Sequence, residues 1–281
     1  MSNALVLQTD FGLKDGAVST MYGVANQVDP AVRVFDLTHG ITPFNIFEGS
    51  FRLAQTVKYW PKGSVFVSVV DPGVGSKRLS LVAKLKTGHY VVTPDNGTLT
   101  HLAQAYGLEE VRIIDEKIDR LPGSEKSATF HGRDIYVYNG ARLAVGQISF
   151  EEVGPVLPTD KVEKLPLNLP KVDGEYLEGN IDITDVNFGS LWTNISNEDW
   201  EKEFQAKYGD EFLVEIYHQN QLRYQARLPY VKTFAEVAVS QPLLYINSVY
   251  TLGLAIRTGS FEEAYRLGAG QDWSIKIKKE N

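Results

Sequence analysis

The chain has 281 residues, of which 43% are apolar and 22% are charged, and its formal net charge is −7 at pH 7. This length corresponds to one large domain or two ordinary ones, and it can bury a substantial core without crosslinks. Because the sequence contains no cysteine, it excludes disulfides, thiolate metal sites and a cysteine nucleophile. The acidic balance and the lack of a Lys/Arg stripe argue against nucleic acid as a partner.

The opening segment MSNALVLQTDFG lacks the basic region and the long apolar region of a signal peptide. No stretch of the sequence reaches the ~20 apolar residues that a membrane-spanning helix requires. These features predict a cytoplasmic protein that associates with no membrane.

Short apolar strands alternate with amphipathic helices up to about residue 150. Strands are predicted at 4–9, 32–37, 64–70, 80–85, 89–93 and 111–114. Helices are predicted over 18–28, 44–60, 99–106 and from His131 to about 145, with Asp15 as a candidate N-cap of the first. This alternation is typical of an α/β fold, with a mostly parallel sheet that helices cover on both faces.

The pattern changes at 155–172, where four prolines occur without a helical period. We predict an N-terminal α/β domain over 1–158, an interdomain linker over 159–172 and a smaller C-terminal domain over 173–281. Several strands of the last domain alternate with period 2, which indicates an antiparallel β domain, either barrel or sandwich. They are predicted at 175–184, 190–195, 211–218, 222–228, 242–247 and 273–278.

Polar residues follow several predicted strands at the point where each strand ends. Asp10 follows the first strand, His39 the second, Asp71 the most apolar strand, and Asn96 the strand at 89–93. Ligands of open α/β sheets bind beyond the carboxyl ends of the strands, so together these residues predict a site. Each one alone is also an ordinary turn residue.

The familiar nucleotide and metal signatures are missing. The segment 72–78 is not a Walker loop, and no GxGxxG follows the first strand. None of the five histidines shares a helix face with another at metal-ligand spacing. The sequence therefore predicts no phosphate cradle, no metal site and no cofactor.

Six motifs occur in a recognisable order: TDFGLKDG (9–16), THGITPFNIFEG (38–49), VDPGVGSKR (70–78), TPDNGTL (93–99), ATFHGRD (128–134) and ITDVNFGSLWTNI (183–195). Together they resemble the S-adenosyl-L-methionine (SAM) hydroxide adenosyltransferases, which are adenosine-forming SAM hydrolases related to the fluorinating and chlorinating SAM enzymes. The resemblance implies a three-layer α/β/α N-terminal domain and an antiparallel, barrel-like C-terminal domain. It also implies a homotrimer with active sites at the subunit interfaces, where SAM or adenosine would bind.

The resemblance assigns the hydrolytic role to Asp71, Arg78 and His131. The halogenating relatives have Tyr at the position of Asp71 and lack the matching Arg and His, so the resemblance favours hydrolysis over halogenation. Taken without the resemblance, Arg78 fits a surface arginine better than a catalytic residue, and His131 fits a buried core histidine better.

The chemistry of SAM hydrolysis suits these residue types. The sulfonium makes methionine a good neutral leaving group, so the reaction needs chiefly a water molecule held in line with the ribose 5′ carbon. Arg78 beside Asp71 should stabilise the carboxylate and make it a poorer base. We therefore expect Asp71 to accept a hydrogen bond from an oriented water or nascent hydroxide, while Arg78 and His131 stabilise negative charge.

The remaining matches imply substrate contacts. Asp10 resembles the residue that holds the ribose hydroxyls. A carboxylate suits this role, because it can accept hydrogen bonds from both hydroxyls. The other predicted substrate-binding residues are Asp15 and Asp185 for the methionine end, Phe44 for the sugar, Phe188 and Ser190 for adenine, Ser248 for the methionine carboxylate, and Asn96. Asp15 also fits a plain helix N-cap, and Phe188 also fits a core phenylalanine.

Three positions depart from the family pattern. Ser190 stands where the family usually has Asn, and Tyr250 and Gly253 stand where it usually has Gly and Glu. These departures affect adenine and methionine recognition more than the hydrolytic set. They leave open a non-catalytic protein that binds adenosine or SAM. A SAM-dependent halide transferase is the other alternative, and Asp71 in place of Tyr argues against it.

Overall fold

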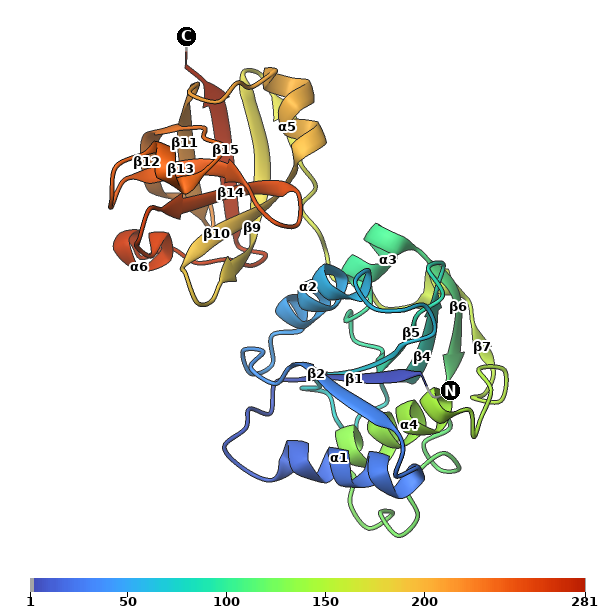
Figure 1. Cartoon of the computed structure of the whole chain (residues 1–281). Coiled ribbons are helices and arrows are strands. Elements are labelled where there is room, and N and C mark those ends of the chain that lie inside the picture. Colours follow the sequence, from blue (N-terminus) through green and yellow to red (C-terminus); the bar gives the residue numbers. More distant parts are fainter. Residues whose placement is uncertain (1–2, 281) are drawn as a thin grey trace. The chain divides into compact units, whose positions relative to one another are not determined.

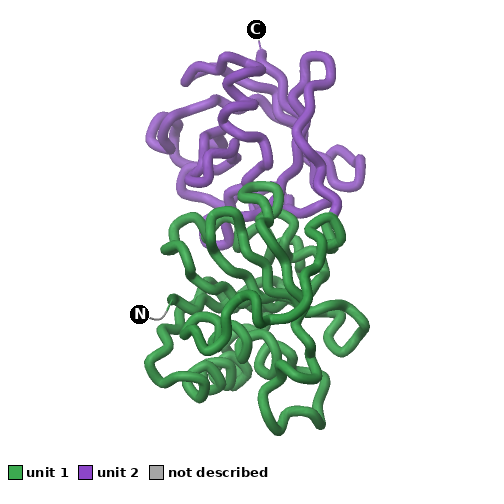
Figure 2. Tube along the Cα trace, turned by 90° about the vertical axis from the view of Figure 1, so that its right-hand side faces the viewer, with its two compact units in different colours: residues 1–165 green, residues 166–281 purple. Residues whose placement is uncertain are grey.

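The computed structural model describes residues 3–280 (Figure 1). Met1 and Ser2, which belong to the amino-terminal segment considered above, and Asn281 lie outside the described residues. The chain forms two compact units, residues 1–165 and 166–281, and the boundary falls in the proline-rich segment (Figure 2). Within the described part of the chain, every helix is too short or too polar to cross a membrane.

Unit 1 is built on a seven-stranded sheet in the order β2-β1-β3-β5-β4-β6-β7. The strands are β1 (Ala4–Thr9), β2 (Arg33–Thr38), β3 (Val65–Val69), β4 (Ser80–Leu85), β5 (Tyr90–Pro94), β6 (Leu108–Ile113) and β7 (Val156–Leu157). Neighbours from β2 to β5 pair in parallel, and β4 pairs antiparallel with both β5 and β6. Only β4 and β7 therefore run against the others, which confirms the predicted mostly parallel sheet.

Helices cover both faces of this sheet, because alternate side chains of its apolar strands point to opposite sides. Leu5 of β1 packs in one core cluster with residues from α1 (Ala17–Val28) and α4 (Tyr138–Val145). The next residue, Val6, packs in a second cluster with residues from α2 (Ile46–Val57) and α3 (Thr100–Tyr106). Figure 1 shows the two helix pairs on opposite sides of β1. The predicted three-layer arrangement is confirmed.

Two details of the predicted helices differ in the structure. The N-cap of α1 is Gly16, not Asp15, although Asp15 Oδ1 does accept a hydrogen bond of 2.9 Å from the amide of Ala17. The helix predicted after His131 begins as a π-helix, η1 (Gly132–Val137), and continues as α4. Wide π turns of this kind occur often at functional sites. A short 3₁₀ turn, η2 (Thr159–Lys161), follows β7.

Unit 2 is an antiparallel sheet in the order β12-β11-β15-β9-β10-β14-β13, with β8 paired to β9. The strands are β8 (Lys171–Asp173), β9 (Tyr176–Asp185), β10 (Ser190–Ser196), β11 (Glu211–His218), β12 (Gln221–Pro229), β13 (Pro242–Ile246), β14 (Thr251–Ile256) and β15 (Trp273–Lys279). A bridge between Tyr230 and Leu244 joins the end of β12 to β13 and nearly closes the sheet. Unit 2 is therefore a β-barrel, not a sandwich.

Five elements of unit 2 were missed by the sequence analysis. They are β8, which falls largely in the predicted linker, α5 (Asn197–Phe204), η3 (Phe234–Glu236), β14, and α6 (Phe261–Tyr265). The helix α5 is polar apart from Trp200 and Phe204 and buries only Trp200, so it gives no apolar stripe. The strand β14 has Gly253 at its centre, which weakens the strand signal.

Candidate active site

The predicted hydrolytic residues of unit 1 come from two loops at the same edge of the sheet. Asp71 follows the carboxyl end of β3, Arg78 precedes the antiparallel β4, and His131 directly precedes η1. Gly75 lets the two loops meet, because it adopts a positive φ of 76° and a Cβ there would lie 3.2 Å from the carbonyl oxygen of Ala128.

Arg78 joins the other two residues. Its Nη2 lies 2.6 Å from Asp71 Oδ2, and its Nε lies 3.1 Å from both carboxylate oxygens. The same Nη2 lies 2.9 Å from Nδ1 of His131. The exposed fractions of the three side chains are 4% for Asp71, 9% for Arg78 and 3% for His131. Arg78 is therefore not the exposed surface arginine that the sequence alone allowed.

His131 is held in its neutral form. Burial lowers the pKa of His131, and the guanidinium groups of Arg78 and Arg120 add to this effect, while Glu116 and Asp71 oppose it. A guanidinium can only donate hydrogen bonds, and Arg78 lies 2.9 Å from Nδ1 while Arg120 lies 3.3 Å from Nε2, so the shorter contact favours the lone pair on Nδ1 and the proton on Nε2. His131 can therefore offer an N–H dipole but not a positive charge.

A cavity of about 220 Å³ opens beside this set. Its lining residues are Asp10, Phe11, Pro43, Phe44, Val69, Asp71, Val74, Thr129, Phe130, His131 and Gly132. It brings together four predicted site residues, two hydrolytic (Asp71 and His131) and two substrate-binding (Asp10 and Phe44). Arg78 does not line the cavity and acts on it through Asp71 and His131.

Asp10 and Phe44 are linked directly. The amide of Phe44 donates a hydrogen bond of 2.8 Å to Asp10 Oδ2. Phe44 has a φ of 67° and is 70% exposed, although it precedes Asn45, the N-cap of α2. A bulky residue in the left-handed region costs of order 1–3 kcal/mol, and such strain clusters at ligand sites. The fold thus holds an aromatic ring at the cavity mouth.

Two predicted substrate-binding residues of unit 1 are absent from the lining of this cavity. Asn96 donates a 2.8 Å hydrogen bond to the carbonyl oxygen of Val70, and its Oδ1 accepts from Thr98, so it braces the segment that leads to Asp71. Asp15 is exposed and bonded to the start of α1. His39, also considered above, is buried between Thr9 and Asp36.

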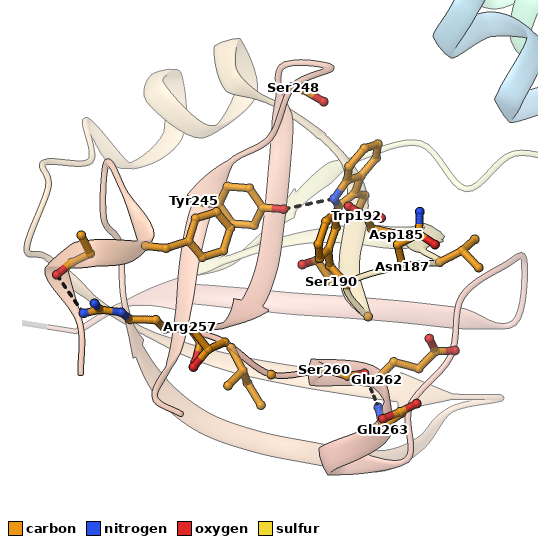
Figure 3. A pocket seen from close by; sticks show the side chains of 18 residues that line it. Asp185, Asn187, Ser190, Trp192, Tyr245, Ser248, Arg257, Ser260, Glu262 and Glu263 are labelled. Carbon is orange, nitrogen blue, oxygen red and sulfur yellow. Dashed lines mark hydrogen bonds between the residues drawn. The ribbon is translucent and has the colours of Figure 1, made fainter. Parts of the chain in front are cut away.

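Unit 2 carries the other predicted contacts around a larger pocket of about 960 Å³ (Figure 3). Asp185, Phe188, Ser190 and Ser248 all line it. Phe188 is 70% exposed, so its alternative assignment as a core phenylalanine is wrong. The position after Phe188 requires glycine, because Gly189 has a φ of 64° and a Cβ there would lie 1.9 Å from Ser260 Oγ.

Two of the departures from the family pattern, Ser190 and Gly253, lie beside Trp192 and Tyr245 at one wall of this pocket. Gly253 pairs with Trp192 on one side and with Tyr245 on the other. A Cβ at Gly253 would lie 2.7 Å from Tyr245 Cε1, so the missing side chain makes room for the tyrosine ring. Trp192 Nε1 then donates a 3.1 Å hydrogen bond to the Tyr245 hydroxyl, as Figure 3 shows. Ser190 lies close to this pair and lines the same pocket.

The third departure, Tyr250, keeps a backbone conformation that glycine favours. Tyr250 adopts a φ of 65°, the left-handed conformation that glycine favours, and is 67% exposed. Asn247 organises this turn, because its Oδ1 accepts hydrogen bonds from the amides of Val249 and Thr251. The turn that presents Ser248 is therefore kept with a tyrosine in a glycine-like conformation.

Sequence reasoning missed several residues around the hydrolytic set. Arg78 Nη1 donates to Glu116, Ser80 bonds to Glu116 and to Tyr136, and Arg120 Nη2 lies 3.3 Å from His131 Nε2. Glu116 follows β6 at the same sheet edge as Asp71, so the strand-end rule could have found it. Within residues 3–280, no group of three or more His, Asp or Glu side chains is placed to hold a metal ion.

Two protein-family models match the chain. The SAM hydroxide adenosyltransferase N-terminal domain matches residues 5–154, and the C-terminal domain of the same family matches residues 179–274. The chain belongs to the SAM hydroxide adenosyltransferase family.

Similar proteins agree with this membership. The (R)-S-adenosyl-L-methionine hydrolase of Methanocaldococcus jannaschii is 32% identical over 83% of this chain and 80% of its own length. A fluorinase of Actinoplanes is 28% identical over 95% of both chains. The crystal structure of an uncharacterised conserved protein from Thermotoga maritima superposes with a TM-score of 0.86, at 31% identity over 98% of this chain and 99% of that one. The chain is thus similar over most of its length both to a SAM hydrolase and to a fluorinase.

Proposed function

We propose that the chain hydrolyses SAM to adenosine and L-methionine. The observation that carries this proposal is the bridge from Arg78 Nη2 to Asp71 and to His131, at 2.6 and 2.9 Å, beside a cavity that also holds Asp10 and Phe44. Membership of the family and the similarity to a SAM hydrolase support the same reaction.

The reaction is a direct displacement. The water oxygen forms a bond to the ribose 5′ carbon while the bond from that carbon to sulfur breaks, and methionine leaves as a neutral thioether. Asp71 lines the cavity and accepts a hydrogen bond from the attacking water, and the proton passes from there to solvent. Two nitrogens of Arg78, Nε and Nη2, donate hydrogen bonds to Asp71 and hold its carboxylate in place. We therefore assign Asp71 the role of orienting the water rather than removing its proton fully.

In this proposal His131 stabilises negative charge as a neutral N–H dipole and not as a cation. A neutral His131 contributes its position and its Nε2–H, while Arg78 and Arg120 supply the positive charge nearby. The developing charge on the nucleophile is therefore met by fixed dipoles and by a buried guanidinium, the kind of preorganised electrostatics that lowers barriers most.

We also propose that the working form is a homotrimer in which the unit 1 cavity of one subunit and the unit 2 pocket of another complete each site. Six of the eight predicted substrate contacts divide between these two pockets, and each unit exposes large apolar residues, Leu13 and Phe44 in unit 1 and Val186 and Phe188 in unit 2. Light scattering tests the assembly. Mixing Asp71→Asn subunits with subunits blocked at Ser190 by a Ser190→Trp change should regain roughly a quarter of wild-type activity if sites are shared. No regain in mixed trimers would refute shared sites.

Product analysis tests the proposed reaction. Purified protein is incubated with SAM, with and without fluoride or chloride, and adenosine and methionine are separated by chromatography. We expect equal amounts of the two products, independent of halide. A halogenated adenosine that requires the halide would make the protein a halide transferase, and tight binding without turnover over hours would make it a binding protein.

A further inference from the structure

Glu116 contacts the edge of Arg78 that faces away from Asp71. Its Oε1 accepts a 2.8 Å hydrogen bond from Arg78 Nη1, while Nε and Nη2 of the same guanidinium serve Asp71. Glu116 lies three residues beyond β6, and its side chain is 29% exposed, against 9% for Arg78. The planar guanidinium is therefore held between two carboxylates, and its rotation is fixed.

The hydrogen bonds behind Arg78 run in one direction. Ser80 Oγ donates to Glu116 Oε1 at 2.6 Å, so its oxygen must accept from its other neighbours. These are Arg78 Nη1 at 3.1 Å and the hydroxyl of Tyr136 at 2.9 Å. Burial raises the pKa of Tyr136, so this hydroxyl keeps its proton and donates. The acceptor at the end of this network is the Glu116 carboxylate.

The ionisation of Glu116 follows from the same contacts. Burial works to raise the pKa of Glu116, but the hydrogen bonds from Ser80 and Arg78 outweigh it, so the pKa lies below its ordinary value. Glu116 is therefore a carboxylate at neutral pH, and it is the charge that compensates the side of Arg78 that Asp71 does not reach.

We infer that Glu116 is a positioning residue, which fixes the rotation of Arg78 so that Nη2 reaches Asp71 and His131 together. The inference rests on the proposed SAM hydrolysis for its kinetic consequence only. Its structural consequence is the tautomer of His131, because Nδ1 stays unprotonated only while Arg78 donates to it. Without Glu116, the contact of 3.3 Å from Arg120 to Nε2 competes for the lone pair.

The charges around His131 make its pKa a second measurable consequence of Glu116. The charged groups that face it are Arg78, Arg120, Glu116 and Asp71, and among them Glu116 raises the pKa of His131 most. Removing the charge of Glu116 while keeping its shape should therefore lower the pKa of His131 further. Because Glu116 Oε2 itself lies 3.7 Å from Nδ1 of His131, this shift reports the nearby charge, while the tautomer reports the position of Arg78.

Two variants and one control test the inference. Glu116→Ala removes both the acceptor and the charge, whereas Glu116→Gln keeps an acceptor oxygen for Arg78 and Ser80. The control, Glu110→Gln, breaks a comparable ion pair of 2.6 Å with Arg112, which lies on β6 away from the cavity. The ring nitrogens of His131 are followed by NMR with ¹⁵N-labelled histidine and assigned by the signal lost in His131→Gln. Steady-state kinetics are measured on the same samples.

We expect the Nε2–H tautomer in the wild type, in Glu116→Gln and in Glu110→Gln, and a mixture of tautomers in Glu116→Ala. We expect the pKa of His131 to fall in Glu116→Gln and to stay unchanged in Glu110→Gln. For Glu116→Ala, kcat should fall about 10- to 100-fold, the size typical for a group that orients a reacting side chain, with little change in KM. Glu116→Gln should recover most of this loss.

The two proposals fail in different ways. A wild-type protein that makes no adenosine would contradict the proposed function, while the His131 signals would still decide the role of Glu116. An unchanged His131 pKa in Glu116→Gln overturns the inference, and this readout holds even where Glu116→Ala does not fold. A wild-type kcat in Glu116→Ala overturns it equally.

Discussion

Arg78 donates hydrogen bonds to Asp71 from one edge of its guanidinium, with Nη2 2.6 Å from Oδ2 and Nε 3.1 Å from each carboxylate oxygen. The pair is almost fully buried, so removing one member leaves an uncompensated charge, which costs about 3–5 kcal/mol in such sites. Nη2 of Arg78, which donates to Asp71, also contacts Nδ1 of His131. Any change in this pair therefore affects Asp71 and His131, the two hydrolytic residues that line the cavity.

The first prediction concerns these three side chains. Asp71→Asn, Arg78→Ala and His131→Ala should each lower kcat for SAM hydrolysis about 100-fold or more, the range for losing a positioned acid–base or electrostatic group. Arg78→Lys should fold better than Arg78→Ala yet stay slow, because an ammonium cannot span Asp71 and His131. SAM binding by calorimetry should persist, since the unit 2 pocket is unchanged. Wild-type turnover in the three main variants would refute the assignment.

The second prediction concerns the pH dependence of kcat. The pKa of His131 lies below its ordinary value of 6.5 through burial, with contributions from Arg78 and Arg120. The neutral form is the one that accepts from Arg78, so kcat should stay constant down to pH 6.5 and fall only at lower pH. A pH–rate profile at saturating SAM measures this. An acid limb above pH 6.5 would contradict a neutral, buried His131.

The third prediction concerns stability, through Asp182 on β9. Burial raises the pKa of Asp182 to about 7, and a hydrogen bond from Asn180 opposes this only in part. A raised folded-state pKa means that this group favours the folded state most below pH 3.8 and that the contribution is lost as the pH rises to about 7. Asp182→Asn, which can still accept from Asn180, should stabilise the protein at pH 8 by on the order of 2 kcal/mol.

Thermal unfolding of both proteins from pH 4 to pH 8 checks this prediction. The gain from Asp182→Asn should grow as the pH rises and level off above pH 7. An equal difference in melting temperature at pH 4 and pH 8 would show that Asp182 does not titrate in this range.

The fourth prediction concerns the wall formed by Tyr245 and Trp192. Gly253→Ala places a Cβ 2.7 Å from Tyr245 Cε1, so the ring must move and the hydrogen bond from Trp192 is lost. Since this wall lines the unit 2 pocket, the Kd for SAM should rise about tenfold, equivalent to about 1.4 kcal/mol. Gly23→Ala is the control, because a Cβ at Gly23 meets no atom within 4 Å. An unchanged Kd in Gly253→Ala would exclude this wall from substrate binding.

The sequence could predict the parts of the site that local patterns mark. The apolar run that forms β3 ends at Val69, two residues before Asp71, and the turn chemistry of the next residues fits a loop at a strand end. Arg78 and His131 could be named only through the motif resemblance, because their contact spans 53 residues of sequence. Local propensity carries no information about such a contact.

The supporting residues were hidden for physical reasons. Tyr136 lies on a π-helix inside an apolar stretch, where it is indistinguishable from a core aromatic until its contact with Ser80 is seen. Glu116 is one of several charged residues after β6, and only its position opposite Arg78 separates it from a surface carboxylate. In unit 2, the consequence of Gly253 depends on the antiparallel register that sets it beside Tyr245.

The central claim, direct attack of an oriented water on SAM, is tested most directly by the fate of the 5′ carbon. SAM stereospecifically deuterated at that carbon is turned over in ¹⁸O-labelled water, and the adenosine and the protein are analysed by NMR and mass spectrometry. Direct attack predicts adenosine with inverted configuration and one solvent oxygen at the 5′ position, with no label in Asp71. Retained configuration, or ¹⁸O in the Asp71 carboxylate, would contradict this account by revealing an ester intermediate.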